Sequence, residues 1–324
     1  MGVKKSKSAP SVAILGGGRL GQAVAALLGP SAADVSLWAR RKAVRTRLAK
    51  KLDTCSVVPN LEDACGEADV VIIAVPASGV RDVMTSFGEV ARGDQIVLHG
   101  VRGVEEGFIL PHKIVREETC IRKIGALGGP LMAPELHAGL PVTAVIASRF
   151  EETVGAVQAI AKSSPIFLHA SKDLVGVEVI GAISNVTAIA VGMAHGLELG
   201  DTARGVLLTH GLADAARIGV GLGAERTTFA GLAGIGDMIP RKVNSTDLHH
   251  DLGKKISAGV FPEDAHIEGL VTAKAALEHA EKSGIGVPLV RAVAAICTRE
   301  LDAREGLMSV LESDLNLDGA FGGR

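Results

Sequence analysis

Three glycines near the start of the chain have the spacing of a phosphate-binding loop. Gly16, Gly18 and Gly21 follow the pattern G-x-G-x-x-G, after a short apolar strand pattern and at the start of a helical one. Such a loop needs glycine for a tight turn, for close approach of the backbone to a pyrophosphate and for packing of the helix on the strand. Phosphates would bind the N–H groups at the helix N-terminus, beside Arg19 and Leu20. The loop predicts a dinucleotide site, because a purely structural turn would not explain this spacing.

The end of the second expected strand indicates which dinucleotide is bound. An Asp or Glu at this point binds the ribose hydroxyls of NAD, whereas an Arg accommodates the 2′-phosphate of NADP. The chain has Trp38 followed closely by Arg40 and Arg41, with no carboxylate. NADP(H) is therefore favoured over NAD(H), and a solvated basic turn is the alternative. Val75 and Pro76 follow the third expected strand, where the nicotinamide half would pass.

A polar pair interrupts an otherwise apolar helical segment, residues 176–196. Ser184 and Asn185 lie in its middle, among small residues that allow helices to pack closely. Such a pair is either filler in a core helix or part of a reaction site. Glu178 and Arg204 are also expected on buried helices, where they could pair with each other or across a subunit contact.

The first half of the chain alternates short apolar strands with helical segments. This alternation favours an α/β fold with a parallel sheet buried on both faces. From about residue 172 the pattern becomes helical. The expected strands lie in residues 11–18, 34–41, 68–76, 94–101, 122–129, 141–148 and 164–171. The expected organisation is a flexible basic leader at 1–9, a dinucleotide-binding domain at 10–172, an all-helical domain at 173–311 and a flexible tail at 312–324.

Composition excludes several classes of function. The chain has 324 residues, of which 47% are hydrophobic, enough for a large core or two domains. A formal net charge of −2 gives no overall basic field that would attract nucleic acid or anionic lipid. The four cysteines are scattered without a CxxC spacing, so we expect a cytoplasmic protein with reduced thiols, without disulfides or a metal site. Charges or prolines interrupt each apolar run, so no membrane span is expected.

Longer motifs support a family resemblance. The segments LWAR, AVPAS, GLPVTAVIAS, SKDLVGVEVIGAISNV, TFAGLAGIGDM and IEGLVTAKAALEHAEKSGIGVPLVRAV occur in this order. In them the chain resembles the bacterial NAD(P)-dependent glycerol-3-phosphate dehydrogenases along nearly its whole length. The resemblance implies a Rossmann domain, then an all-α domain like the C-terminal domain of 6-phosphogluconate dehydrogenase, and a homodimer. It also implies hydride transfer between NAD(P)H and dihydroxyacetone phosphate.

The resemblance assigns roles to several residues, with replacements at the reaction centre. It implies a catalytic lysine near an aspartate. The aspartate is Asp237, the asparagine after the catalytic position is Asn185, and the lysine position holds Ser184. A serine hydroxyl does not supply a proton near pH 7 as a partly desolvated lysine does. At two substrate positions Arg102 replaces a lysine and Leu131 replaces a polar residue.

The segment that resembles the family's phosphate-binding loop departs as well. On an ungapped alignment Leu248 replaces an arginine and His249 replaces an asparagine. Loss of a proton donor slows a reaction by a factor of about 10²–10⁴. Together with the loss of the phosphate-binding arginine, it would make ordinary glycerol-3-phosphate turnover barely measurable. Ala133, at the end of GPLMA, and Glu268 in IEGL match positions close to the cofactor.

Three interpretations remain open. In the first, the protein is a dehydrogenase for a substrate other than the family's. His249 and His250 would then be acid–base groups. Arg241 and Lys242 would hold an anion. In the second, it is an inactive NAD(P)(H)-binding protein that signals cofactor occupancy to a protein partner. In the third, the protein is an ordinary glycerol-3-phosphate dehydrogenase, and its key residues lie at other positions than the ungapped alignment assigns. An enzyme needs a polar, ligand-sized cavity, which a sensor would fill with side chains such as Leu131.

Overall fold

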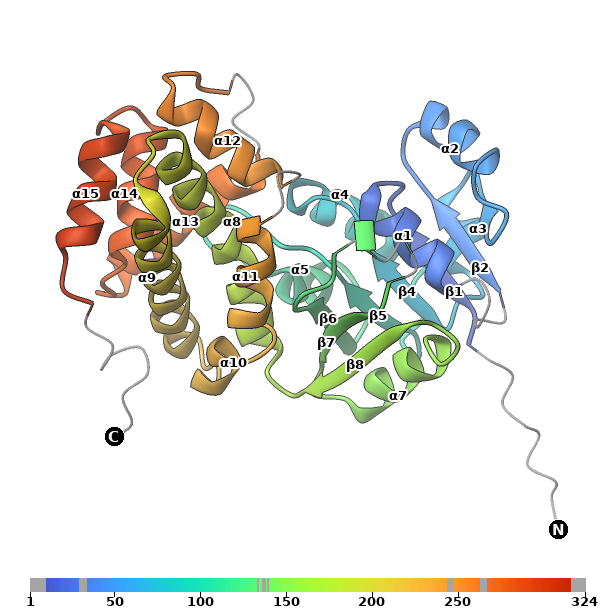
Figure 1. Ribbon diagram of the computed structural model, residues 1–324. Helices are drawn as coiled ribbons and strands as arrows, with labels where there is room; N and C mark the ends of the chain where they lie inside the picture. Colours follow the sequence, from blue (N-terminus) through green and yellow to red (C-terminus); the bar gives the residue numbers. More distant parts are fainter. Residues whose placement is uncertain are drawn as a thin grey trace, which may run out of the picture.

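The computed structural model describes residues 10–28, 34–132, 134, 135, 138, 140–243, 247–262 and 267–315, without the side chains of 240–243. A part built around a β-sheet lies beside a part made of helices (Figure 1). The expected basic leader and most of the expected tail lie outside the described residues.

Eight strands form one sheet in the order β3-β2-β1-β4-β5-β6-β7-β8. The strands are β1 (Val12–Leu15), β2 (Val35–Trp38), β3 (Ser56–Val57), β4 (Val70–Ile73), β5 (Ile96–His99), β6 (Lys123–Gly128), β7 (Val142–Ala147) and β8 (Ile166–Ser171). All except β3 lie within the ranges expected from the sequence. Neighbouring strands are parallel except β6 and β7, which pair antiparallel, so β7 and β8 run opposite to the others. The parallel sheet predicted from the sequence holds for β1 to β6, and β7 and β8 depart from it because apolar composition does not report strand direction.

Helices cover both faces of the sheet, as in a doubly wound fold. Alternate residues of each strand point to opposite faces. Val12 and Ile14 pack with α1 (Arg19–Leu28), α2 (Lys42–Ala49) and α7 (Glu151–Ile160). Ala13 and Leu15 pack with α3 (Leu61–Cys65), α4 (Val80–Gly88) and α5 (Pro111–Glu118). The carboxyl ends of β1, β4 and β5 therefore meet at one edge, where ligands bind in such folds.

The second part consists of helices around a central one. They are α8 (Leu174–Gly196), α9 (Gly200–Gly221), α10 (Arg226–Ala230), α11 (Ile235–Val243), α12 (Leu248–Ser257), α13 (Glu268–Lys282), α14 (Pro288–Cys297) and α15 (Ala303–Glu312). A Cβ on Gly192 of α8 would lie 2.1 Å from the carbonyl oxygen of His250, and one on Gly253 of α12 would lie 2.1 Å from that of Ile189. Glycine is needed here because the two backbones touch.

The central helix α8 is buried in a core shared by both parts. Its apolar side chains form one cluster with Ala126 of β6 and Val145 of β7. The helix is long and apolar enough to cross a membrane, contrary to the expectation that charges interrupt every such run. However, 89% of its apolar window is buried inside the protein, as expected of a core helix. The carboxylate of Asp173 accepts the N–H of Gly176 at 2.8 Å and so caps its first turn.

Candidate active site

The glycine loop lies between β1 and α1, where the sequence predicts it. Gly16 has φ +130°, and a Cβ there would lie 2.4 Å from the carbonyl oxygen of Ala74. A Cβ on Gly21 would lie 1.9 Å from the carbonyl oxygen of Gly16. The fold itself therefore requires these two glycines. A Cβ on Gly18 would meet only the carbonyl oxygen of Ala74, at 4.0 Å, so space is left free beside the loop.

A cavity of about 490 Å³ opens beside this loop, at the carboxyl edge of the sheet, and reaches α8, α12 and α13. A cavity of this size holds a small ligand. Its wall contains these predicted site residues: Gly18, Arg19, Leu20, Val75, Pro76, Arg102, Leu131, Asn185, His249 and Glu268. The structure thus brings the cofactor and substrate candidates to one place.

Arg102 links the cavity wall to α8 and α11. Its Nη1 donates to Oδ1 of Asp237 at 3.0 Å, and its Nη2 donates to Oδ2 of Asp237 and, at 2.8 Å, to Oγ of Ser184. Nδ2 of Asn185 donates to the backbone oxygen of Arg102 at 2.8 Å and fixes the turn. Burial alone would lower the pKa of Arg102, but Asp237 outweighs it and raises the pKa. A permanently charged guanidinium therefore reaches the position that the resemblance assigns to a lysine.

The hydroxyl of Ser184 is engaged on both sides. Besides accepting from Arg102, it donates to the carbonyl oxygen of Gly181 at 2.8 Å. Its proton is therefore committed to the helix backbone. In this arrangement Ser184 positions Arg102 and does not donate a proton to a ligand.

The two adjacent histidines of α12 lie in different surroundings. His249 lines the large cavity, and its Nε2 accepts the N–H of Gly269 at 3.2 Å. The ring proton of neutral His249 is therefore on Nδ1, 3.6 Å from Oδ1 of Asp247. His250 does not line this cavity; its Nε2 lies 3.2 Å from Nδ1 of His195.

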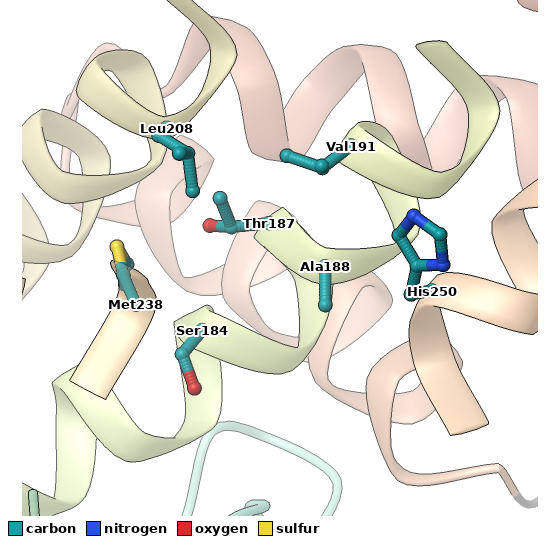
Figure 2. Close-up of a pocket in the computed structure, with 7 residues that line it drawn as sticks. All are labelled: Ser184, Thr187, Ala188, Val191, Leu208, Met238 and His250. Atoms are coloured by element: carbon teal, nitrogen blue, oxygen red, sulfur yellow. The ribbon is translucent and has the colours of Figure 1, made fainter. Parts of the chain in front are cut away.

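His250 instead faces a pocket of only about 10 Å³ between the helices (Figure 2). Ser184, Thr187 and Val191 line it from one face of α8, because residues three, four and seven positions apart share a face. Leu208, Met238 and His250 close it from other helices. The volume suffices for about one water. The larger cavity is therefore the one that fits a substrate.

Glu268 positions the start of α13 against the sheet part. Its Oε1 accepts the N–H of Ala77 at 2.7 Å, one residue after Pro76. This contact fixes the turn after β4, where the nicotinamide half of a dinucleotide is expected. It also joins the two parts across the mouth of the cavity.

The remaining predicted residues lie away from the cavity or outside the residues that the structure describes. Arg40 and Arg41 are exposed beyond β2, with Nη1 of Arg40 3.9 Å from Oδ2 of Asp82. The backbone oxygen of Trp38 accepts the N–H of Gly16 at 2.8 Å. Leu248 is 64% exposed and does not fill the cavity. The side chains of Arg241 and Lys242, and all of Ala133, lie outside the described residues.

The sequence did not single out several residues of the cavity wall. Gly100 and Val101 follow β5, and Gly128 ends β6. The rule that ligands bind at the carboxyl ends of parallel strands would have found the first two. Asp247 is the N-cap of α12 and also lines the cavity. An Asp directly before a helical pattern is the signal for such a cap.

Two further expectations concern charged groups elsewhere. Glu178 does not pair with Arg204, as the sequence suggested it could: its carboxylate contacts His99 and His112, and Arg204 contacts Asp201. Among the described residues, no group of three or more His, Cys, Asp or Glu side chains could hold a metal ion.

Both parts of the chain match models of a known protein family. The family model of the NAD-dependent glycerol-3-phosphate dehydrogenase N-terminus matches residues 11–154, and that of its C-terminus matches residues 173–308. The chain is 32% identical to "Glycerol-3-phosphate dehydrogenase [NAD(P)+]" of Macrococcus caseolyticus, over 94% of this chain and 98% of the relative. Identity to the protein of that name from Thermobifida fusca is 31%, over 93% and 96%.

Solved structures agree with these sequence matches. A glycerol-3-phosphate dehydrogenase from Coxiella burnetii superposes with a TM-score of 0.88 at 26% identity, over 94% of this chain and 99% of that one. A yeast glycerol-3-phosphate dehydrogenase superposes with a TM-score of 0.79 at 18% identity, over 95% and 100%, a likeness of fold alone.

Proposed function

The chain belongs to the NAD-dependent glycerol-3-phosphate dehydrogenase family, and we propose that it is an active NAD(P)(H)-dependent oxidoreductase. The proposed reaction is hydride transfer between the cofactor and the carbonyl of dihydroxyacetone phosphate or a related small substrate. One observation carries this proposal: the cavity of about 490 Å³ stays open, with Arg102, Asn185 and His249 in its largely apolar wall, although the catalytic lysine position is Ser184. Leu131 lines the cavity wall without filling it.

The glycine loop suits the cofactor. Free space beside Gly18 and the N-terminus of α1 would receive the pyrophosphate. When bound, the reduced nicotinamide supplies the hydride. The exposed cations Arg40 and Arg41 support a preference for NADP(H), since a 2′-phosphate needs charged donors at the end of β2.

Arg102 would act on the substrate carbonyl by its charge. Asp237 and Ser184 hold the guanidinium in the cavity wall, so it is preorganised to stabilise the oxyanion that develops as hydride arrives. An arginine does not release a proton at neutral pH. We infer that the alkoxide takes its proton from water, which makes turnover slower than with a lysine donor by a factor of about 10²–10⁴.

A specific observation favours a second candidate, an inactive cofactor sensor. The proton of Ser184 is committed to Gly181, and Nε2 of His249 is committed to the backbone of Gly269. Neither residue is then ready to act as general acid. In that case the protein would bind NADP(H) without turnover and act through a protein partner.

The two candidates are separated by a paired measurement. NADPH and NADH are titrated by fluorescence, and then the absorbance of the reduced cofactor is followed after adding dihydroxyacetone phosphate. The variants are Ser184→Lys and, as a control for loss of the hydroxyl, Ser184→Ala. Slow wild-type turnover that rises in Ser184→Lys supports the enzyme. Tight NADPH binding with no turnover of any small 2-oxo substrate would contradict the enzyme proposal and favour the sensor.

We also propose a homodimer, from the family resemblance, and a cytoplasmic location, from the scattered cysteines. Light scattering on the purified protein tests the first, and fractionation of cells tests the second.

A further inference from the structure

A third cavity lies away from the candidate active site. It measures about 50 Å³ and is lined by His112, Arg116, Arg122 and Arg149, with Ile124 and Phe150 among its apolar neighbours. Ile124 is near the start of β6, whereas Gly128 at the other end of β6 lines the large cavity. At about 3.3 Å per residue the two cavities are on the order of 13 Å apart along the strand.

Three arginines from different segments converge on this small cavity. Arg116 comes from α5, Arg122 precedes β6 and Arg149 follows β7. Within the described part of the chain, none of the three has an acidic side chain at ion-pair distance. All three are exposed to water, which screens their mutual repulsion, and each can turn its guanidinium group toward an anion in the cavity.

The acidic residues nearest to Arg116 in sequence already contact another arginine. Glu117 and Glu118, directly after Arg116, both contact Arg81, which also contacts Glu105. The charge of Arg81 is therefore balanced by three carboxylates. The three arginines of the small cavity lack such a set of carboxylates.

A buried histidine forms one wall of the small cavity. His112 is only 8% exposed, and its backbone N–H and Nδ1 are both bonded to the carboxylate of Glu178. Donation from Nδ1 leaves Nε2 as the ring nitrogen without a hydrogen-bond partner among the described residues.

We propose that this cavity is a binding site for a small phosphate-type oxyanion, held by the guanidinium groups of Arg116, Arg122 and Arg149, with the ring of His112 forming one wall. Guanidinium groups match the oxygens of phosphate in geometry and charge. A volume of about 50 Å³ holds on the order of four water-sized groups. It therefore fits a phosphate group and is too small for a nucleotide.

The test is calorimetric titration of inorganic phosphate into the full chain, at constant ionic strength made up with chloride. The wild type should bind phosphate saturably. Arg122→Gln and Arg149→Gln should each weaken binding by about tenfold, the loss of one charge-assisted hydrogen bond. The control is Arg47→Gln, which removes an exposed arginine of α2 and should leave the affinity unchanged.

Three results decide the question. Saturable binding that weakens in both cavity variants, with unchanged melting temperatures in the absence of phosphate, supports the site. Absence of saturable binding overturns it. Binding that persists unchanged in both variants also overturns it, because the phosphate would then lie elsewhere, for example on the glycine loop.

Titration of methyl phosphate in the same way distinguishes free phosphate from a phosphate ester as the ligand. Tighter binding of inorganic phosphate would identify the free ion as the ligand. Equal or tighter binding of methyl phosphate would identify the phosphate group of an ester. The same variants should bind NADPH like the wild type, so failure of this site and failure of the proposed enzyme activity are distinguishable.

Discussion

Nη1 of Arg102 lies 3.0 Å from Oδ1 of Asp237, and this pair joins the sheet part to the helical part in the wall of the large cavity. The side chain of Asp237 is 2% exposed and that of Arg102 is 20% exposed. The cation at the reaction centre is thus supplied by the turn after β5. The resemblance implied a cation on α8, where Ser184 now supports the guanidinium.

Arg102→Met should destabilise the fold as well as abolish turnover. Asp237 would lose its guanidinium partner, and breaking a buried ion pair costs about 3 kcal/mol or more. Urea unfolding of the wild type and the variant measures the loss. The double variant Arg102→Met/Asp237→Leu should recover most of it, because no buried charge is left. Equal stability of Arg102→Met and the wild type would contradict the pairing.

Alanine substitutions in the glycine loop should separate folding from cofactor binding. Gly21→Ala places a Cβ against the carbonyl oxygen of Gly16 and should cost about 2 kcal/mol of stability. Gly18→Ala meets open space and should change stability by less than about 0.5 kcal/mol. Its methyl group enters the space for the pyrophosphate, so NADPH affinity should fall at least about tenfold. Thermal melting and fluorescence titration measure the two effects, and unchanged affinity in Gly18→Ala would place the cofactor elsewhere.

The double variant Arg40→Ala/Arg41→Ala should alter the cofactor preference. Both side chains are exposed beyond β2, and the long, exposed ion pair of Arg40 with Asp82 can give way to a 2′-phosphate. NADPH affinity should fall about tenfold or more through loss of charge-assisted hydrogen bonds, while NADH affinity stays within about twofold. Parallel fluorescence titrations with both cofactors measure this, with Arg47→Ala as the control. A similar loss for both cofactors would argue against a 2′-phosphate contact.

Glu178→Gln should lower stability in a pH-dependent way. Burial alone would raise the pKa of Glu178, but hydrogen bonds to His112 and His99 outweigh it and lower the pKa to about 2. A carboxyl with a depressed folded-state pKa contributes stability above its unfolded pKa, near 4.3, and that stability is lost as the pH falls toward 2. A difference of about two pKa units corresponds to about 3 kcal/mol at pH 7. Urea unfolding over a pH series should show that the difference in unfolding free energy between wild type and Glu178→Gln shrinks in acid. Glu152→Gln, at an exposed position, should not differ from the wild type at any pH.

His250 should make the fold weaken on mild acidification. Burial, and then the charge of His195, lower the pKa of His250. A histidine with a depressed folded-state pKa resists protonation, so stability is lost as the pH falls below the ordinary value near 6.5. The wild type should therefore lose more stability than His250→Gln between about pH 7 and pH 5. Thermal melts at each pH measure the difference, and exposed His169→Gln should follow the wild type.

Much of the fold could be predicted from local pattern. Seven strands were predicted because apolar runs bounded by glycines and charges are typical of buried strands. Strand β3 was missed, since its two residues carry no periodicity. The reversal at β7 was missed because strand direction depends on how the chain returns to the sheet.

The candidate site was only partly predictable. The glycine loop is a local signal, but the contact of Arg102 with Ser184 joins residues 82 positions apart. His249 and His250 could not be distinguished in sequence, because adjacent helical residues point in different directions. Only the packing of α12 on α8 determines which ring faces the cavity.

The burial of α8 has a mechanical consequence. Glu178 on this helix is held by His99 and His112 from the sheet part, and the apolar cluster continues across the boundary near residue 172. A hinge at that boundary would separate these contacts and expose the core to water. The two parts are therefore held together by buried contacts as well as by the chain that connects them.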